Sequence, residues 1–216
     1  MASGWKAFKG LIACKNWKRV AGYWLLFSAL CITLPAVVGH YFKILEQSVE
    51  HPEAEELPEF SGQLGELWSR GLAKIVALVT PWLLVLVVCT GLSLLGESLT
   101  YVPTARKHWS TPELVAILSC LTLIGSTAFL TPALILQSHR APNWYSTLNL
   151  PKILSIVGAG GSAYIPLGLF APFAWIPMLM LAMTGIGVLA VPPLAAILLM
   201  VHARWSGLFL ASHLTD

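Results

Sequence analysis

Charged residues are scarce in this chain: only 11% of its 216 residues are Asp, Glu, Lys or Arg, whereas 56% are hydrophobic. Soluble domains usually carry about 25% charged residues, so lipid must cover much of this protein's surface. The length leaves room for several spans of about 20 residues each, but not for a large catalytic domain outside the membrane as well. The sequence therefore predicts an all-α, polytopic membrane protein that forms one membrane domain over residues 1–216.

Motifs that bind metals, nucleotides or nucleic acid are also lacking. The four cysteines form no CxxC pair, HExxH and CxxCH are absent, and VGAGGSAY (157–164) lacks both the GxGxxG spacing and GK[ST]. Gly158 and Ser162 have instead the four-residue spacing by which small residues let membrane helices approach closely. The net charge of +3 lies in local clusters rather than in a stripe, so we expect no nucleic acid partner.

Long runs without any formal charge predict about five transmembrane helices. Three runs give spans at 20–42, 75–96 and 114–137. A further run from 153 to 201 is about twice as long as one helix needs, and TGIG at 184–187 offers a turn near its middle. We divide this region into spans at 164–183 and 188–209, although its prolines leave one broken helix or a re-entrant pair open.

The charges around the first predicted span differ in sign. Residues 1–19 combine five cations with aromatic and aliphatic residues at helical spacing, which predicts a basic amphipathic helix on an anionic leaflet and a cytoplasmic N-terminus. The loop at 46–71 holds seven Glu and one Arg, so we place it outside, and its second half predicts an interfacial helix. The expected location is a bacterial cytoplasmic (inner) or photosynthetic membrane.

Three stretches of the sequence carry a family resemblance: NWKRVAGYW, then EELPEF with RGLAKIV, and finally TGIGVLAVPPLAAILLMVHARWSGLFL. Together they resemble a family of prokaryotic multi-span membrane proteins catalogued only as a domain of unknown function, with an ELPEW-type loop motif and a terminal GIG…P…AH stretch. Phe60 stands where that motif has Trp. The resemblance covers nearly the whole chain and implies packed spans with interfacial helices. It implies no activity and no catalytic residue.

Histidines and the acidic loop supply the candidate site residues. His40 and His202, with His139, fall near one leaflet in the predicted topology, and a neutral imidazole can bind haem iron or the magnesium of a chlorophyll-type pigment. The alternative is that each ring bonds a headgroup, water or a carbonyl. Four carboxylates of the loop form either a docking surface for a partner or a solvated segment: Glu53, Glu55, Glu56 and Glu59.

No predicted span has an acid, Lys or Arg at its centre, although ion-coupled transporters usually keep one there. We therefore expect no enzyme, but a non-catalytic accessory or scaffold subunit of a bacterial membrane protein complex, photosynthetic or respiratory. Its partners would be membrane lipid and other subunits of that complex. Two alternatives stay open: a small channel or permease that uses the Pro/Gly-broken C-terminal half, and a pigment- or haem-binding membrane subunit.

Overall fold

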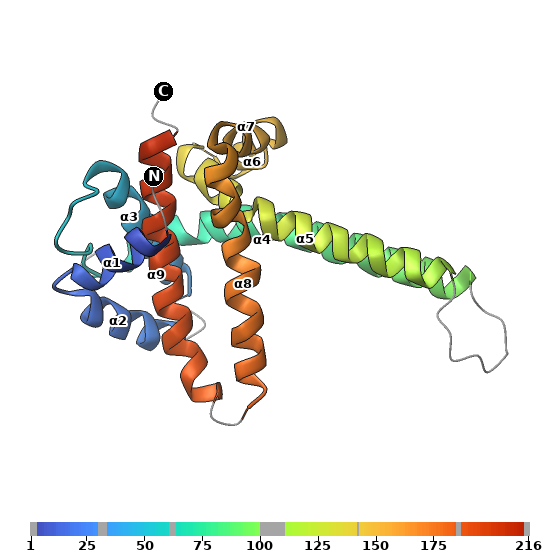
Figure 1. Ribbon diagram of the computed structural model, residues 1–216, viewed down its shortest axis with the longest axis horizontal. Coiled ribbons are helices and arrows are strands. Elements are labelled where there is room, and N and C mark those ends of the chain that lie inside the picture. The colour runs from blue at the N-terminus through green and yellow to red at the C-terminus, as the bar shows by residue number, and fades with distance from the viewer. Residues whose placement is uncertain are drawn as a thin grey trace.

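The chain is helical in the parts that the computed structural model describes, which are residues 4–29, 34–60, 64–99, 111–141, 143–184 and 187–213. No strand occurs among these residues, so the all-α prediction is confirmed. The helical elements are α1 (Gly4–Ala13), α2 (Trp17–Ala29), α3 (Leu34–Glu50), α4 (Leu64–Leu99), α5 (Thr111–Arg140), α6 (Trp144–Thr147), α7 (Leu150–Gly160), the 3-10 turn η2 (Gly161–Ala163), α8 (Tyr164–Ala182) and α9 (Gly187–His213). Figure 1 shows a helical body from which two hairpins, α4/α5 and α8/α9, leave in different directions.

Four segments of the described chain are long and apolar enough to cross a membrane: Leu64–Leu95, Thr111–Arg140, Leu150–Phe170 and Ala190–His213. The predicted spans 75–96 and 114–137 lie inside α4 and α5, and 164–183 and 188–209 fall almost wholly on α8 and α9. The third apolar segment starts earlier than predicted because it includes α7 and η2. Since α8 and α9 each continue through their prolines, the described part of the chain from Tyr164 to His213 forms two separate helices rather than one long broken helix.

The first predicted span, 20–42, stays a prediction, and one contact in the structure argues against it. The described parts of its charge-free run belong to α2 and α3, and residues 30–33 between them lie outside the described chain. The flanks of the run argue against a crossing, because the backbone N–H of Lys15 donates to the carbonyl of Glu55 over 3.0 Å. A hydrocarbon core about 30 Å thick cannot separate two residues in contact. The basic N-terminal segment and the acidic loop therefore lie on the same side, not on opposite sides as predicted.

One of the two predicted interfacial helices differs in the structure. The segment 1–19 is not one helix, because α1 ends at Ala13 and α2 begins at Trp17. Ala7 and Leu11 are fully buried, since α1 packs on α9, while Trp5 remains 63% exposed. The helix predicted in the second half of the acidic loop is the start of α4, which continues without interruption into the apolar segment.

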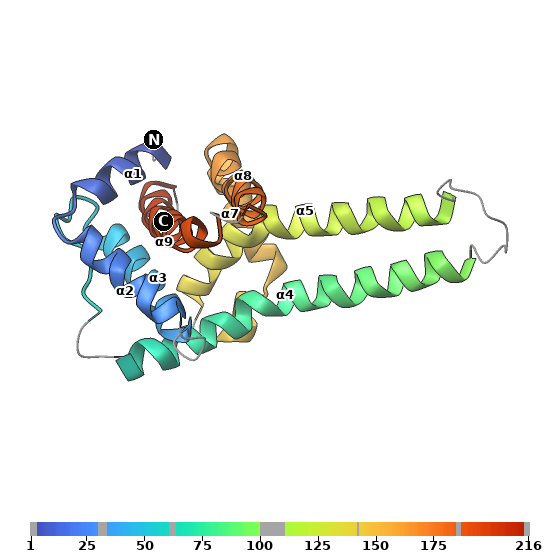
Figure 2. The same cartoon turned by 90° about the horizontal axis from the view of Figure 1, so that it is seen from below.

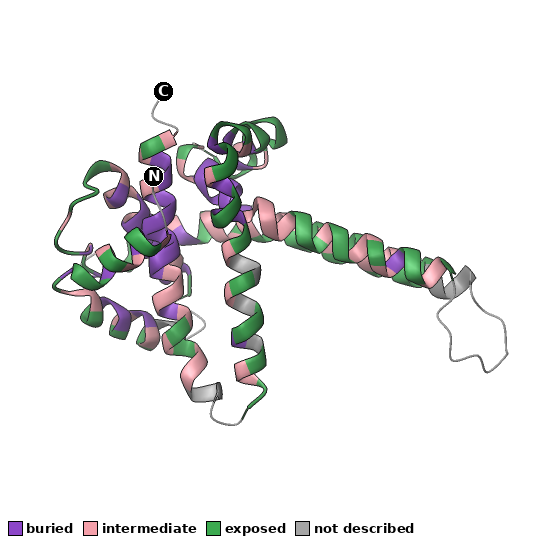
Figure 3. Ribbon diagram, viewed as in Figure 1, coloured by how far each residue is buried: buried purple, intermediate pink, exposed green. Residues whose placement is uncertain are grey.

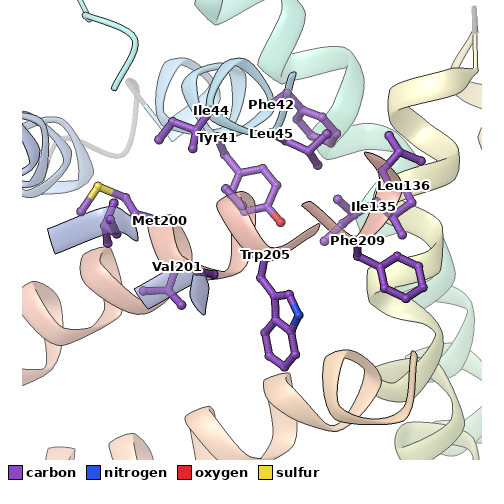
Figure 4. Packing of buried hydrophobic residues seen from close by; sticks show 14 of the residues in the cluster. Tyr41, Phe42, Ile44, Leu45, Ile135, Leu136, Met200, Val201, Trp205 and Phe209 are labelled. Carbon is purple, nitrogen blue, oxygen red and sulfur yellow. The ribbon is translucent and has the colours of Figure 1, made fainter. Parts of the chain in front are cut away.

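The body of the molecule is built around α9, which contacts α1, α2, α3 and α8. Figure 3 shows the buried residues gathered on the inner faces of these helices and on the C-terminal half of α9. Phe42 and Phe209 are fully buried at the centre, and Trp205 extends from α9 toward α8, where its ring lies edge-on to Phe170 (Figure 4). More than half of the apolar window of α9 is buried, so this helix is mainly covered by protein.

Helix α3 is held between α4 and α9 by close backbone contacts at glycines. A Cβ atom on Gly71 of α4 would lie 2.7 Å from the backbone nitrogen of Gly39, and still closer to the carbonyl of Pro35, both in α3. On the other side of α3, a Cβ on Gly207 of α9 would lie 2.6 Å from the Cβ of Ser48. Atoms essentially never approach a real Cβ this closely, so these three glycines set the distances between the helices. By contrast Gly158, which we expected to mediate such a contact, faces open space.

Helix α5 is interrupted at Pro132, and a residue of α8 completes its hydrogen bonding. In a regular helix the N–H of Ala133 would donate to the carbonyl of Phe129, four residues earlier. Here the hydroxyl of Tyr164 is inserted between them: it accepts from the Ala133 N–H over 3.1 Å and donates to the Phe129 carbonyl over 2.7 Å. A proline in a membrane helix is tolerated when a neighbour satisfies the freed backbone groups in this way.

The α4/α5 hairpin carries most of the exposed apolar surface. It extends far from the body in Figure 2, and only 6% of the apolar window of each helix is buried. Residues such as Leu86 and Leu118 are each 62% exposed. A monomer in water cannot leave so continuous an apolar surface uncovered, so lipid or another protein must surround this hairpin.

Candidate functional site

The acidic loop folds back onto the N-terminal helices and forms what we call the loop junction: Asn16, Trp24, His40, Arg204 and residues 51–60. Asn16, between α1 and α2, both donates to the Leu57 carbonyl and accepts from the Leu57 N–H, each over 2.8 Å. Leu57 and Phe60 are 3% and 5% exposed. The loop is thus fixed by paired hydrogen bonds and by burial of the two apolar residues of LPEF.

His40 occupies the centre of the junction, and its hydrogen bonds define its tautomer. The indole Nε1–H of Trp24 can only donate, and it reaches Nδ1 of His40 over 2.9 Å. Nε2 must therefore carry the proton, and it donates to the Pro58 carbonyl over 2.8 Å. Phe60 stacks on the ring with centroids 4.4 Å apart. Both nitrogens of His40 are used, so no lone pair is left for a metal, haem or pigment.

The surroundings of His40 also determine its charge. The ring is fully buried, and burial is the main cause that lowers the pKa of His40 from 6.5 to about 4. The nearby Lys43 lowers this pKa further, while the Pro58 carbonyl opposes the shift. His40 is therefore neutral at physiological pH, as the hydrogen bond from Trp24 requires.

Arg204 joins the C-terminal helix to the loop junction. Its side chain is buried, and its guanidinium donates to Sγ of Cys14 over 3.1 Å and to the Pro52 carbonyl over 3.3 Å. Both acceptors, the Cys14 sulfur and the Pro52 carbonyl, are uncharged. Within the described chain, this cation is therefore held by hydrogen bonds to neutral groups and not by a carboxylate. Arg204 belongs to one of the three stretches that carry the family resemblance, and the junction brings all three together.

The four predicted docking carboxylates, Glu53, Glu55, Glu56 and Glu59, are all exposed. Glu55 forms an ion pair with Lys15 at 2.6 Å, and the hydrogen bond from that ammonium lowers the pKa of the Glu55 carboxyl. Glu59 lies 3.5 Å from the guanidinium of Arg19. Two of the four carboxylates are therefore already matched by cations of this chain, which leaves a mixed-charge surface in place of the purely acidic one that the sequence predicts.

His202 lies in a different environment from His40. The hydroxyl of Tyr41, which points from α3 toward α9 in Figure 4, is 2.6 Å from Nδ1 of His202, and Phe170 of α8 stacks on the ring at 5.2 Å. His202 is 6% exposed, and its Nε2 has no hydrogen-bond partner within the described chain. His202 thus has one ring nitrogen available, but the structure does not pair it with His40 on a common ligand.

His139, the third histidine of the predicted leaflet, belongs to another cluster. It lies 4.0 Å from the carboxylate of Glu46, which also pairs with Arg70 of α4. Lys74 donates to the Ser138 carbonyl close by. Among the described residues no group of three His, Cys, Asp or Glu side chains could hold a metal ion.

Sequence reasoning missed two residues that hold this site together. Asn16 gives no signal, because an isolated Asn between two helices is common. Arg204 gives a signal that can be recognised: it lies within the predicted span 188–209, where a cation is costly, so it should have a dedicated partner. The structure buries Arg204.

Comparison of the chain with protein-family models, with curated proteins and with solved structures gives no match. The class that the structure defines is therefore an all-α membrane protein with four candidate spans and a helical body. The resemblance to a family of unknown function stays a prediction.

Proposed function

We propose that this protein is a non-catalytic accessory or scaffold subunit of a bacterial membrane protein complex, photosynthetic or respiratory. The observation that carries the proposal is the α4/α5 hairpin, which is apolar along its length and almost unburied by its own chain. The hairpin extends away from the body in a different direction from α8/α9 (Figure 1). Helices of a partner subunit are the cover that fits such a projecting hairpin.

The polar groups of the loop junction support a structural role. Trp24, His40 and Asn16 are bonded to one another or to the loop backbone, and Arg204 is bonded to Pro52 and Cys14. A general base or nucleophile must instead present a reactive atom to a substrate. The junction is better suited to holding α1, α2, α3 and α9 as one rigid body than to a reaction.

The distribution of cations supports a cytoplasmic body. Of the 13 Lys and Arg residues, all but Arg106 and Lys107 belong to the body or to the helix ends that meet it. Lys and Arg set orientation, whereas Asp and Glu contribute little, so the acidic loop does not oppose this assignment. With four spans, the N- and C-termini would both lie in the cytoplasm.

Site-specific photo-crosslinking in native membranes tests the scaffold role. A photoreactive phenylalanine at Leu86 or Leu118, both exposed on the hairpin, should yield adducts with defined protein subunits that mass spectrometry identifies. The same probe at Trp5, exposed on the body, is the matched control and should not yield those adducts. Lipid adducts alone at both hairpin positions, together with purification as a stable and pigment-free monomer, would contradict the proposal.

A second candidate function, binding of a haem or chlorophyll-type pigment, is supported by one observation. Nε2 of His202 is buried without a partner, as a ring nitrogen awaiting a metal would be. The test is the visible absorption spectrum of the gently purified protein. A bound chromophore that is lost in His202→Ala but kept in His40→Ala would establish this role, and a spectrum without any chromophore in the wild type would remove it.

A further inference from the structure

Two neighbouring cavities lie along one face of α5. The first, of about 280 Å³, is lined by apolar groups and threonines, including Pro81 and Leu84 of α4 and Thr127 and Leu134 of α5. The second, of about 270 Å³, is lined at the end of α5 by Gln137 and Arg140 and on the α6 and α7 side by Ser146, Lys152 and Ser155. The lining residues of α5 recur at positions three or four apart, along one side of the helix: Thr127, Leu130, Thr131, Leu134, Gln137 and Arg140. Such a stripe is one face of a helix, so the two cavities lie one after the other along the same face of α5.

The polar cavity has the chemistry of an anion site. Arg140 and Lys152 contribute two positive charges, and no carboxylate is among the described residues that line it. Gln137 is 5% exposed, and its side-chain amide is oriented by a hydrogen bond to the Ser146 carbonyl over 3.2 Å. The hydroxyl of Ser155 and the guanidinium of Arg140 supply donors suited to phosphate oxygens.

The depth of the polar cavity matches the headgroup region of a bilayer. The charge-free part of α5 ends at His139, directly before Arg140. Trp144 and Tyr145, 50% and 62% exposed, lie beside the cavity in α6, where aromatic residues typically mark the membrane boundary. The apolar cavity begins one turn deeper, at Leu134, within the candidate span.

We infer that the polar and the apolar cavity together form a groove that binds one anionic phospholipid. Its phosphate would lie between Arg140 and Lys152, and an acyl chain would lie in the apolar cavity between α4 and α5. A free phosphate would use only the polar cavity, and a zwitterionic lipid would bring a cationic headgroup next to two cations. The inference does not depend on the proposed scaffold role, because the groove is formed within this chain.

Native mass spectrometry of the full-length protein in a mild detergent tests this site. The probes are dioleoyl phosphatidylglycerol, dioleoyl phosphatidylcholine and glycerol 3-phosphate. The wild type should retain one phosphatidylglycerol at least tenfold more tightly than phosphatidylcholine. Because each cation near a phosphate contributes about 1 kcal/mol, Arg140→Gln/Lys152→Gln should weaken retention about thirtyfold.

The matched control removes two charges from the exposed N-terminal helices, as Lys9→Gln/Lys18→Gln, and should change retention less than twofold. Circular dichroism and thermal melting of both double variants show whether the fold is kept. Equal losses in the two double variants, or equal retention of the two lipids, would overturn the inference. So would displacement of the lipid by glycerol 3-phosphate at equal concentration, since that outcome defines a site for free phosphate.

Discussion

The glycine contact between α3 and α4 gives the most direct test of the packing. In Gly71→Ala the new methyl would lie 2.7 Å from the Gly39 nitrogen and still closer to the Pro35 carbonyl, whereas ordinary contact begins at 3.4 Å. Helix α4 must therefore move away from α3 by more than about 1 Å. The obstacle is backbone, which cannot rotate aside, so the cost falls near the upper end of the overpacking range, about 3 kcal/mol. Alanine regains about 1 kcal/mol of helix propensity. The net loss is about 2 kcal/mol, or roughly 4–8 °C in melting temperature for a chain of this size.

Gly91→Ala is the matched control, since Gly91 lies in the same helix with nothing within 4 Å of its Cβ position. This variant should gain only the higher helix propensity of alanine, with no steric cost, and should melt about 2–4 °C above the wild type. Differential scanning fluorimetry in one detergent measures both variants. Gly39→Ala/Gly71→Ala should cost less than the sum of its single changes, because one separation of the helices accommodates both methyls. If Gly71→Ala melts as high as Gly91→Ala, the close contact does not exist in the protein.

Three further predictions test the junction, the topology and the α5 kink. Because the unfolded chain binds a proton on His40 near pH 6.5 and the folded chain only near pH 4, His40 should contribute about 2 kcal/mol to the loss of stability between pH 7.5 and pH 5. In denaturant titrations, His40→Gln should reduce the loss by that amount. A zero-length carbodiimide should link Lys15 to Glu55 in native membranes, and peptide mapping without that link would restore a span at 20–42. Tyr164→Phe should lower the unfolding free energy by about 1–3 kcal/mol, because it leaves buried backbone groups of α5 unsatisfied, whereas Tyr145→Phe on the exposed α6 should leave it almost unchanged.

Composition and charge-free runs were sufficient to predict the helical membrane fold and the positions of α4, α5, α8 and α9. These signals are local: about 20 apolar residues form a helix in lipid whatever their neighbours do. The run at 20–42 meets the same criterion, and yet the contact between Lys15 and Glu55 argues against a crossing. Its residues Trp24, His40 and Tyr41 make polar contacts with the acidic loop and with α9, which a count of charges does not register.

The candidate site was predicted only in part for a related reason. Histidine at a helix end suggested metal binding, but the neutral state and both hydrogen bonds of His40 depend on Trp24 and Pro58, which are 16 and 18 residues away in the chain. We placed the basic and acidic segments on opposite sides of the membrane because the positive-inside rule assumes that the apolar run between them crosses the bilayer. Contacts such as that between Asn16 and Leu57 are long-range, and a single sequence contains no periodicity that would indicate them.

The inserted hydroxyl of Tyr164 has a consequence for the order in which the chain assembles. Ala133 is synthesised 31 residues before Tyr164, so α5 enters the membrane with an open turn at Pro132. Until α8 arrives, the N–H of Ala133 and the carbonyl of Phe129 must be satisfied by water or remain unpaired, and both states are costly in hydrocarbon. We expect the first hairpin to stay loosely structured during biogenesis and to become rigid only when the second hairpin docks. Truncated nascent chains that end before and after α8 should therefore differ in the protease resistance of α5.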